Sequence, residues 1–178
     1  MMHMMELVKK LRFDLGDMEE PFFYSNDDLI SRLTEALYDY SRYRPRRRKG
    51  LIKLVPGVTE YNLPEDYQTW IEGLAGYEIL DRTLITPVTP AGHSKLSFYY
   101  YADHTIESLS VRDHRILLDY CMAKILYEIV REGAEISGLK LGKGLQINFD
   151  NFDKIAQEAI FREKRYEQSV KKPIGMWT

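Results

Sequence analysis

The residue types that most often carry catalysis are few in this sequence and are spread along it. The chain has 178 residues, with one cysteine, Cys121, and four histidines. His114 lies seven residues before Cys121 in a predicted helix, and at a rise of about 1.5 Å per residue the two are roughly 10 Å apart. A thiol and an imidazole that act together must be in hydrogen-bond contact. We therefore predict that Cys121 is a buried apolar residue rather than a nucleophile.

Two other patterns resemble ligand sites but lack the spacing that such sites need. Asp103–His104 and Asp113–His114 are adjacent acid and imidazole pairs, whereas a metal site needs convergent ligands, such as two histidines one helical turn apart. The segment GLKLGKG at residues 138–144 has three residues between its first two glycines. A phosphate loop has four there, and has Ser or Thr where this chain has Gly144. We expect no metal and no cofactor, interpret 138–144 as a connector, and predict that the protein is not an enzyme.

The clearest concentration of charge is a basic segment, RYRPRRRK, at residues 42–49. Its cations, with no acid among them, are Arg42, Arg44, Arg46, Arg47, Arg48 and Lys49. Cations at the end of a helix offset its dipole and stabilise it by up to about 1 kcal/mol each. Because this many cations exceed what one helix end requires, the segment also indicates a docking surface for an acidic partner or for DNA phosphates. Both interpretations stay open.

The last residues of the sequence form a second candidate interaction segment. Pro173 and Gly175 end the last predicted helix, and Ile174, Met176 and Trp177 lie beyond it. Apolar residues outside the elements need something to cover them, and tryptophan is enriched among residues that dominate binding energy. The tail either folds back onto its own domain or inserts into a neighbouring protein.

The composition favours one folded domain and excludes several classes of protein. Hydrophobic residues make up 44% and charged residues 29%, which excludes a disordered or collagen-like chain. The formal net charge is −2, so any affinity for nucleic acid must come from a local patch. The single cysteine excludes a disulfide framework. No apolar run has the length of a signal peptide or a membrane span, and we expect a soluble protein of the cytoplasm without a membrane anchor.

Hydrophobic periodicity predicts helices at both ends of the sequence and strands between them. Helices are predicted at 5–15, from Ser25 or Asn26 to 44, at 111–133, and from 151 to about 170. Residues 51–102 contain alternating runs instead, and Pro56–Gly57 predicts a type II turn that joins the first two as a hairpin. The predicted fold is mainly α, of the α+β class. A helical core of about four helices (5–44 and 110–170) carries a small antiparallel sheet (51–102) within one domain, 1–170, followed by the tail, 171–178.

Four segments follow one another along the sequence: LRFDLGD, SNDDLISRLTEALYDYSRYRPR, IKLVPGVTEYNLPEDY and DHRILLDYCMAKILYEI. In this order they resemble the head-to-tail adaptor proteins of tailed bacteriophages and prophages. The similarity covers most of residues 7–170 and consists of structural patterns rather than an invariant signature. The YNLPEDY segment is also similar to one in related phage connector and tail-tubular proteins.

The resemblance implies a helical core with a β-rich insertion, whose copies assemble into a dodecameric ring beneath the portal protein. Such a ring extends the channel for packaged DNA, which passes without sequence-specific recognition, and gives the stopper or tail its docking face. The C-terminal segment commonly reaches toward the portal, which implies docking roles for Lys171, Lys172, Pro173, Ile174, Met176 and Trp177. The implied location is the virion neck, after assembly in the host cytoplasm. The insertion at 51–102 departs from shorter members of the family.

The charge pattern is compatible with a ring but also with a different function. A ring requires two different, complementary patches on each subunit. Eight acids and only Arg32 lie between Asp14 and Asp39, so this acidic segment and the basic segment 42–49 are candidates for such a pair. The alternative is a small DNA-binding protein that uses the basic segment, whose affinity would fall steeply with salt.

Overall fold

The structure is a computed structural model that describes residues 4–133, 140–141, 145–146 and 152–171. The chain divides into two compact units, Met1–Tyr43 with Thr105–Thr178, and Arg44–His104. We call them the helical unit and the strand unit, and each has its own hydrophobic core. The predicted α+β class is confirmed. The single predicted domain with an insertion corresponds to two units, and the strand unit contains that insertion.

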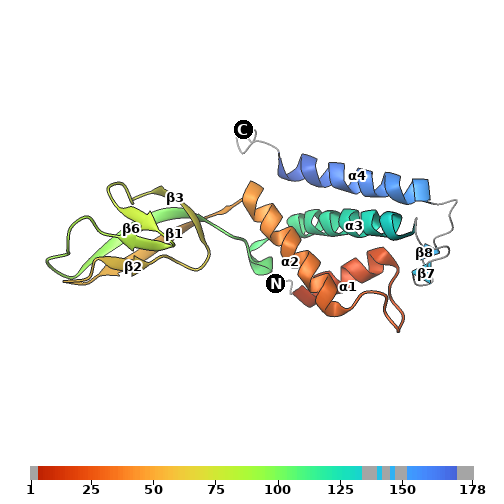
Figure 1. Ribbon diagram of the computed structural model, residues 1–178, viewed down its shortest axis with the longest axis horizontal. Coiled ribbons are helices and arrows are strands. Elements are labelled where there is room, and N and C mark those ends of the chain that lie inside the picture. The colour runs from red at the N-terminus through yellow and green to blue at the C-terminus, as the bar shows by residue number, and fades with distance from the viewer. Residues whose placement is uncertain (1–3, 134–139, 142–144, 147–151, 172–178) are drawn as a thin grey trace. The chain divides into compact units, whose positions relative to one another are not determined.

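In the helical unit, three helices pack against a central one. Its helices are α1 (Met4–Leu15), α2 (Asn26–Tyr43), α3 (Val111–Gly133) and α4 (Phe152–Val170), and the 3-10 turn η1 (Ile106–Ser108) precedes α3. Helices α3 and α4 run side by side, and α1 and α2 both contact α3 (Figure 1). Buried residues from all four helices form one core, to which α3 contributes Leu117, Leu118, Cys121, Met122, Ile125, Leu126 and Ile129. Helix α3 is therefore the central element, as its nearly continuous apolar pattern predicts.

Local signals set the ends of these helices. Ser25 Oγ accepts a hydrogen bond from the Asp28 N–H at 3.1 Å, and the Asp28 carboxylate accepts one from the Ser25 N–H at 3.1 Å. This reciprocal pair satisfies two amides at the start of α2. Helix α1 ends before Gly16, whose φ of 70° is a left-handed conformation that glycine adopts without strain. Helix α2 ends at Tyr43 because Pro45 disfavours helical geometry at the residue before it.

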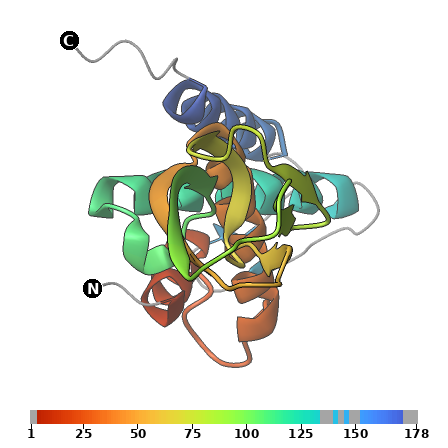
Figure 2. The same ribbon diagram turned by 90° about the vertical axis from the view of Figure 1, so that its left-hand side faces the viewer.

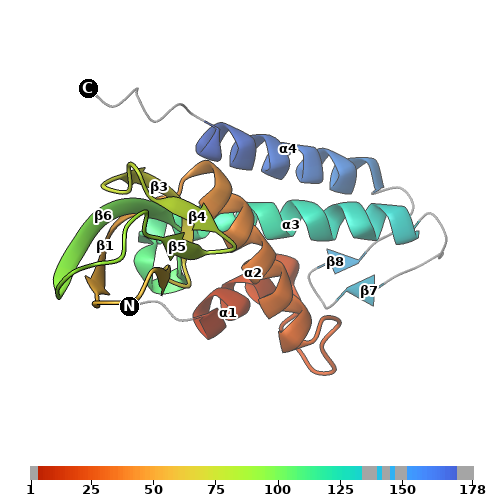
Figure 3. The ribbon, with the colours of Figure 1, turned by 60° about the vertical axis from the view of Figure 1, so that its left-hand side comes forward.

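The strand unit consists of two small antiparallel sheets. Strands β1 (Arg46–Leu54), β6 (Ser94–Ala102) and β3 (Tyr67–Glu72) form one sheet in that order. Strands β2 (Glu60–Asn62), β5 (Thr83–Ile85) and β4 (Glu78–Leu80) form the other. In Figure 2 the strand unit is turned toward the viewer. Figure 3 also labels β7 (Lys140–Leu141) and β8 (Leu145–Gln146), a two-stranded pair that follows α3 in the chain.

The strand pairing differs from the prediction at two points. The turn at Pro56–Gly57 forms, because the Val58 N–H donates to the Val55 carbonyl at 3.2 Å and Gly57 has a φ of 82°. The predicted hairpin across this turn is wrong, since β1 pairs with β6 and β2 pairs with β5. Strand β1 also begins at Arg46 rather than at residue 51. A nine-residue partner strand that carries the buried Phe98 and Tyr100 offers more hydrogen bonds and more buried area than a local hairpin does.

Candidate functional site

The residues considered first for catalysis are packed into the helical core. The Cys121 side chain is fully buried, and its Sγ donates to the Arg32 carbonyl oxygen at 3.4 Å. Burial raises the pKa of the Cys121 thiol to about 12, which is the opposite of what a nucleophile requires. His114 is also buried, with Nε2 3.1 Å from the Ile106 carbonyl oxygen. The predicted burial of Cys121 is confirmed.

Other candidate ligand residues are used in local structure. Asp113 lies in the first turn of α3, where its backbone N–H donates to Ser110 Oγ at 3.3 Å and its carboxylate accepts from the same hydroxyl at 2.6 Å. Asp103 accepts a hydrogen bond from the Gln68 side chain. Within the described ranges, no group of three or more His, Cys, Asp or Glu residues is placed to hold a metal ion. Most of the glycine-containing connector at 138–144 lies outside those ranges.

A buried ion pair fixes the loop between α1 and α2. Arg12 and Asp17 are both buried, and the Arg12 Nη1 to Asp17 Oδ2 distance is 2.6 Å. Arg12 Nη2 also donates to the Tyr24 carbonyl at 2.8 Å and to Asn26 Oδ1 at 2.9 Å. Asp17 Oδ1 accepts from the Phe23 N–H at 2.8 Å. The start and the end of the loop are therefore tied to each other through side chains that water does not reach.

Several apolar side chains of this loop are exposed to solvent. Met18, Phe22 and Phe23 are exposed on it, and the Phe13 side chain at the end of α1 is 73% exposed. The Arg12 guanidinium lies 4.0 Å from the centre of the Phe22 ring, which fixes that ring as well. We call these four apolar residues the loop patch. Because several large apolar side chains are exposed within residues 13–23, the loop patch has the character of an interaction surface.

A groove of about 490 Å³ adjoins the loop patch between α1 and the start of α3. Phe13 and Met18 line one part of it and Val111 and Leu118 another; its remaining lining residues are Lys9, Lys10, Asp14, His114 and Arg115. His114 Nδ1 is buried without a hydrogen-bond partner among the described residues. The apolar lining residues suit this groove to a partner that brings apolar atoms.

The basic segment is divided between the two units and, in β1, between two faces of a sheet. Arg42 lies in the last turn of α2, so the helix-dipole interpretation applies to it. The other cations belong to the strand unit. Arg48 pairs with Asp66, and Arg47 Nη2 lies 2.9 Å from Glu72 Oε1. Since side chains alternate along a strand, Arg46 and Arg48 lie on the side of the buried Gly50, and Arg47 and Lys49 lie on the opposite side.

The register of the sheet adds cations that sequence reasoning missed. On the face opposite to Gly50, Arg47 pairs with Tyr101, Lys49 with Tyr99, Leu51 with Ser97, and Lys53 with Lys95. We call these eight residues the outer sheet face. The alternation of Lys49, Leu51 and Lys53 in the sequence could have predicted the β1 residues of this face. The position of Lys95 beside Lys53 could not be predicted, because the two residues are distant in the sequence and the predicted hairpin assigned β1 a different partner.

The predicted C-terminal docking segment is described only at its first residue. Lys171 Nζ lies 2.6 Å from Glu167 Oε1 and 5.9 Å from the centre of the Tyr43 ring. Lys171 and Tyr43 also line a cavity of about 180 Å³ between α2, α3 and α4. Lys172, Pro173, Ile174, Met176 and Trp177 lie outside the described residues.

Tyrosines in this cavity are hydrogen-bond donors to carboxylates. The Tyr166 hydroxyl donates to Asp39 Oδ2 at 2.5 Å, and the Tyr120 hydroxyl donates to Glu35 Oε1 at 2.9 Å. Burial, and then these carboxylates, raise the pKa of both phenols above the ordinary value. A phenol that is held neutral as a donor ties helices together, and it does not act as a base near neutral pH.

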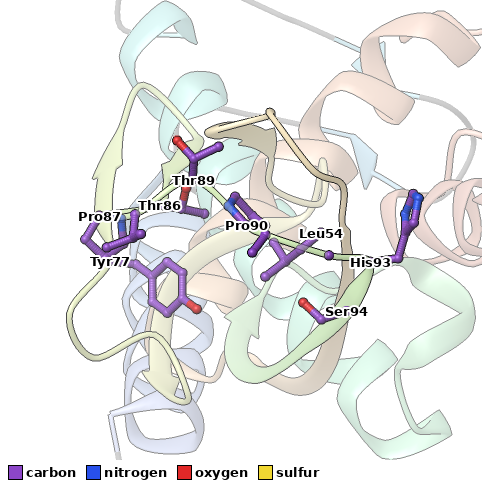
Figure 4. Close-up of a pocket in the computed structure, with 11 residues that line it drawn as sticks. Leu54, Tyr77, Thr86, Pro87, Thr89, Pro90, His93 and Ser94 are labelled. Carbon is purple, nitrogen blue, oxygen red and sulfur yellow. The ribbon is translucent and has the colours of Figure 1, made fainter.

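The strand unit has a separate pocket of about 410 Å³ beside the loop that precedes β6. Tyr77 and His93 are its titratable lining residues. Figure 4 shows Tyr77 with Pro87 at one end and His93 at the other, so the phenol and the imidazole do not face each other. The remaining labelled residues are Leu54, Thr86, Thr89, Pro90 and Ser94. This lining offers hydroxyl groups and apolar surface, without an acid beside the imidazole.

Comparisons with known proteins give no match that would assign a function to these surfaces. No protein-family model matches this sequence. No curated protein matches it either. In the part of the chain that the structure describes, no helix has both the length and the apolar character needed to cross a membrane. In the described residues, the surfaces with the features of an interaction site are the loop patch with its groove and the outer sheet face.

Proposed function

We propose that this protein is a structural adaptor of the neck of a tailed bacteriophage. Its copies form a ring, a dodecamer in this proposal, that joins the portal protein to the stopper or tail and surrounds the passing DNA. The four segments that resemble such adaptors support this proposal. The α+β architecture, in which a strand-rich unit interrupts a set of helices, is the arrangement that the resemblance implies.

The observation that carries the proposal is the ordered, apolar loop patch. A ring needs contacts that resist force, and an exposed ion pair supplies only about 0 to 1 kcal/mol. Burying a Phe or Met side chain contributes roughly 1.5 to 3 kcal/mol. The loop patch offers four such side chains, of which Phe13 and Met18 line a groove of about 490 Å³. We infer that a neighbouring subunit covers this surface.

Charge has a smaller part in this contact than the sequence indicated. Of the acidic segment between Asp14 and Asp39, Asp17 is buried with Arg12, and Glu35 and Asp39 accept hydrogen bonds from tyrosines. These carboxylates stabilise the helical unit, so the acidic surface is reduced. Apolar burial supplies the affinity in this proposal, and the remaining charges set the orientation of the subunits.

The test is assembly with the cognate portal, observed by electron microscopy and by light scattering after gel filtration. The wild-type chain is expected to form a discrete ring on the portal. The double variant Phe13→Ser with Met18→Ser is expected to keep its helical circular dichroism and to lose the ring. Val88→Ser is the matched control, because Val88 is 76% exposed and lies in the strand unit. A chain that ends at Val170 tests the tail and is expected to dock on the portal more weakly.

Each part of the proposal has an outcome that contradicts it. If the wild-type chain never associates with its portal, the adaptor function is wrong. If the double variant assembles as well as the wild type does, the loop patch is not the subunit contact. If the chain ending at Val170 docks normally, the tail has no docking role.

A further inference from the structure

The outer sheet face concentrates positive charge that the strand unit does not neutralise. Arg47, Lys49 and Lys53 project from alternate positions of β1, and Lys95 projects from β6. Arg47 pairs with Glu72, whereas the three lysines have no ion-pair partner among the described residues. The whole chain has a net charge of −2. The charge of this face is therefore a local feature.

Two of these lysines lie directly opposite each other. Lys53 and Lys95 are paired positions in the β1 and β6 ladder. Side chains at such positions have Cβ atoms about 5 Å apart, and like charges there destabilise a sheet. Neither ammonium group has a nearby carboxylate to relieve the repulsion in the described residues. A bound anion between them would remove this cost, so the pair indicates a binding site rather than a stabilising contact.

The arrangement fits a regular polyanion. From Arg47 to Lys53 the strand rises about 20 Å, at about 3.4 Å per residue. Tyr101 and Tyr99 lie on β6 opposite Arg47 and Lys49, and the Arg47 guanidinium is 4.8 Å from the centre of the Tyr99 ring. Lines of cations with interspersed aromatic side chains are typical of surfaces that follow a nucleic-acid backbone. Lysine is an established phosphate ligand that acts as a point charge, so it follows a backbone without requiring a fixed geometry.

We propose that the outer sheet face binds the sugar–phosphate backbone of DNA, without sequence specificity. Lys49, Lys53 and Lys95 contact phosphates, and Lys53 and Lys95 share one phosphate group. This site goes beyond the adaptor function and does not depend on it, because the residues lie in the strand unit and the loop patch lies in the helical unit. It replaces the linear segment 42–49 with residues from two strands as the DNA-contacting surface.

The test measures binding of the full-length chain to a short, fluorescein-labelled DNA duplex by fluorescence anisotropy at several salt concentrations. Each neutralised phosphate contributes about −0.9 to the slope of log affinity against log salt, so one phosphate at Lys49 and one shared by Lys53 and Lys95 predict a slope near −2. The double variant Lys53→Ala with Lys95→Ala is expected to reduce the magnitude of the slope by about 1, because the shared phosphate contact is lost, and to weaken binding uniformly across DNA sequences. Its melting temperature is expected to stay equal or rise, because the repulsion is removed.

The matched control removes two lysines from the helical unit. Lys154→Ala with Lys164→Ala, at two exposed positions of α4, changes the net charge by the same amount and is expected to leave the affinity and the slope unchanged. Absence of binding by the wild-type chain at low salt would overturn the proposal. Equal losses in both double variants would also overturn it, because the attraction would then be diffuse.

One more outcome separates DNA from a protein partner. The Lys53→Ala and Lys95→Ala variant could bind DNA like the wild type and yet fail to assemble with the portal. The outer sheet face would then bind an acidic protein surface, and the DNA proposal would be wrong while the adaptor function stood. Normal assembly together with lost DNA binding supports both proposals.

Discussion

Burial holds several ionisable side chains of the helical unit in their neutral forms. It raises the pKa of Cys121 and of Tyr24 to about 12, from ordinary values of 9.0 and 10.0. Burial also raises the pKa of Tyr120 and Tyr166, whose neutral hydroxyls donate to Glu35 and Asp39. The neutral forms of these groups are therefore part of the folded state.

These shifts predict a loss of stability at high pH. A group whose pKa is raised on folding releases its proton first in the unfolded chain, so the free energy of unfolding falls as pH rises past the unfolded pKa. We expect the melting temperature, measured by circular dichroism, to be constant up to about pH 9 and to fall between pH 9 and 12. Tyr166→Phe removes one such group and is expected to make the fall shallower. A melting temperature that stays constant to pH 12 would contradict this interpretation.

Residue-scale features were predictable where their causes are local. Cys121 could be placed in the core because its neighbours one helical turn away are apolar. The partners of the tyrosines were not predictable, since Tyr166 and Asp39 are 127 residues apart. The buried Arg12 and Asp17 pair was missed although the two residues are near in sequence. Charged residues are almost never fully buried unless paired, and the pairing here depends on the path of the loop.

At the scale of elements, one glycine shows how tightly the β1 and β6 strands fit. Gly50 is paired with Phe98, whose side chain is 1% exposed. A Cβ atom at Gly50 would lie 2.3 Å from the Phe98 ring, closer than atoms of two side chains can approach. The ring covers the glycine and fills the space that a side chain would take. This contact fixes the register that brings Lys53 opposite Lys95.

Gly50→Ala is therefore expected to destabilise the strand unit. Overpacking of a filled core costs roughly 1 to 3 kcal/mol, and urea unfolding followed by tyrosine and tryptophan fluorescence would measure the loss. Gly92→Ala is the control, because a Cβ atom there meets nothing within 4 Å. Adding Phe98→Leu to Gly50→Ala is expected to restore part of the stability. Equal stability of Gly50→Ala and the wild type would show that the register has another cause.

The helices were more predictable than the sheets, because helix ends depend on neighbouring residues and strand pairing depends on residues far apart in the sequence. Capping residues, Gly16 and Pro45 are signals within one helical turn of the ends they determine. Strand positions were predicted for β1, β2, β4, β5 and β6, but pairing is a contact between distant segments and follows from total burial. Strand β3 (Tyr67–Glu72) was missed because bulges interrupt its alternation.

At the scale of the whole molecule, the chain enters and leaves the strand unit at adjacent points. Arg46 and Ala102 are paired at the ends of β1 and β6, so their Cα atoms are about 5 Å apart. Each unit has its own core. These features are those of a domain that is inserted in a loop of another domain. Such a domain has its own core and can be removed without breaking the core of the other.

The two proposals can therefore be separated by removing one unit. In a chain where a short Gly/Ser linker of about four residues replaces residues 46–102, the linker spans the gap with ease, at up to about 3.5 Å per residue. We expect this chain to keep the helical circular dichroism and cooperative melting of a folded core, because the excised residues form the other core. It should still assemble into a ring on the portal, with the loop patch as the subunit contact, and it should lose affinity for duplex DNA. Loss of helical structure would mean that the helical unit needs the strand unit to fold. Ring assembly lost from a folded chain would move the subunit contact to the strand unit, and DNA binding retained by that chain would move the phosphate contacts to the helices.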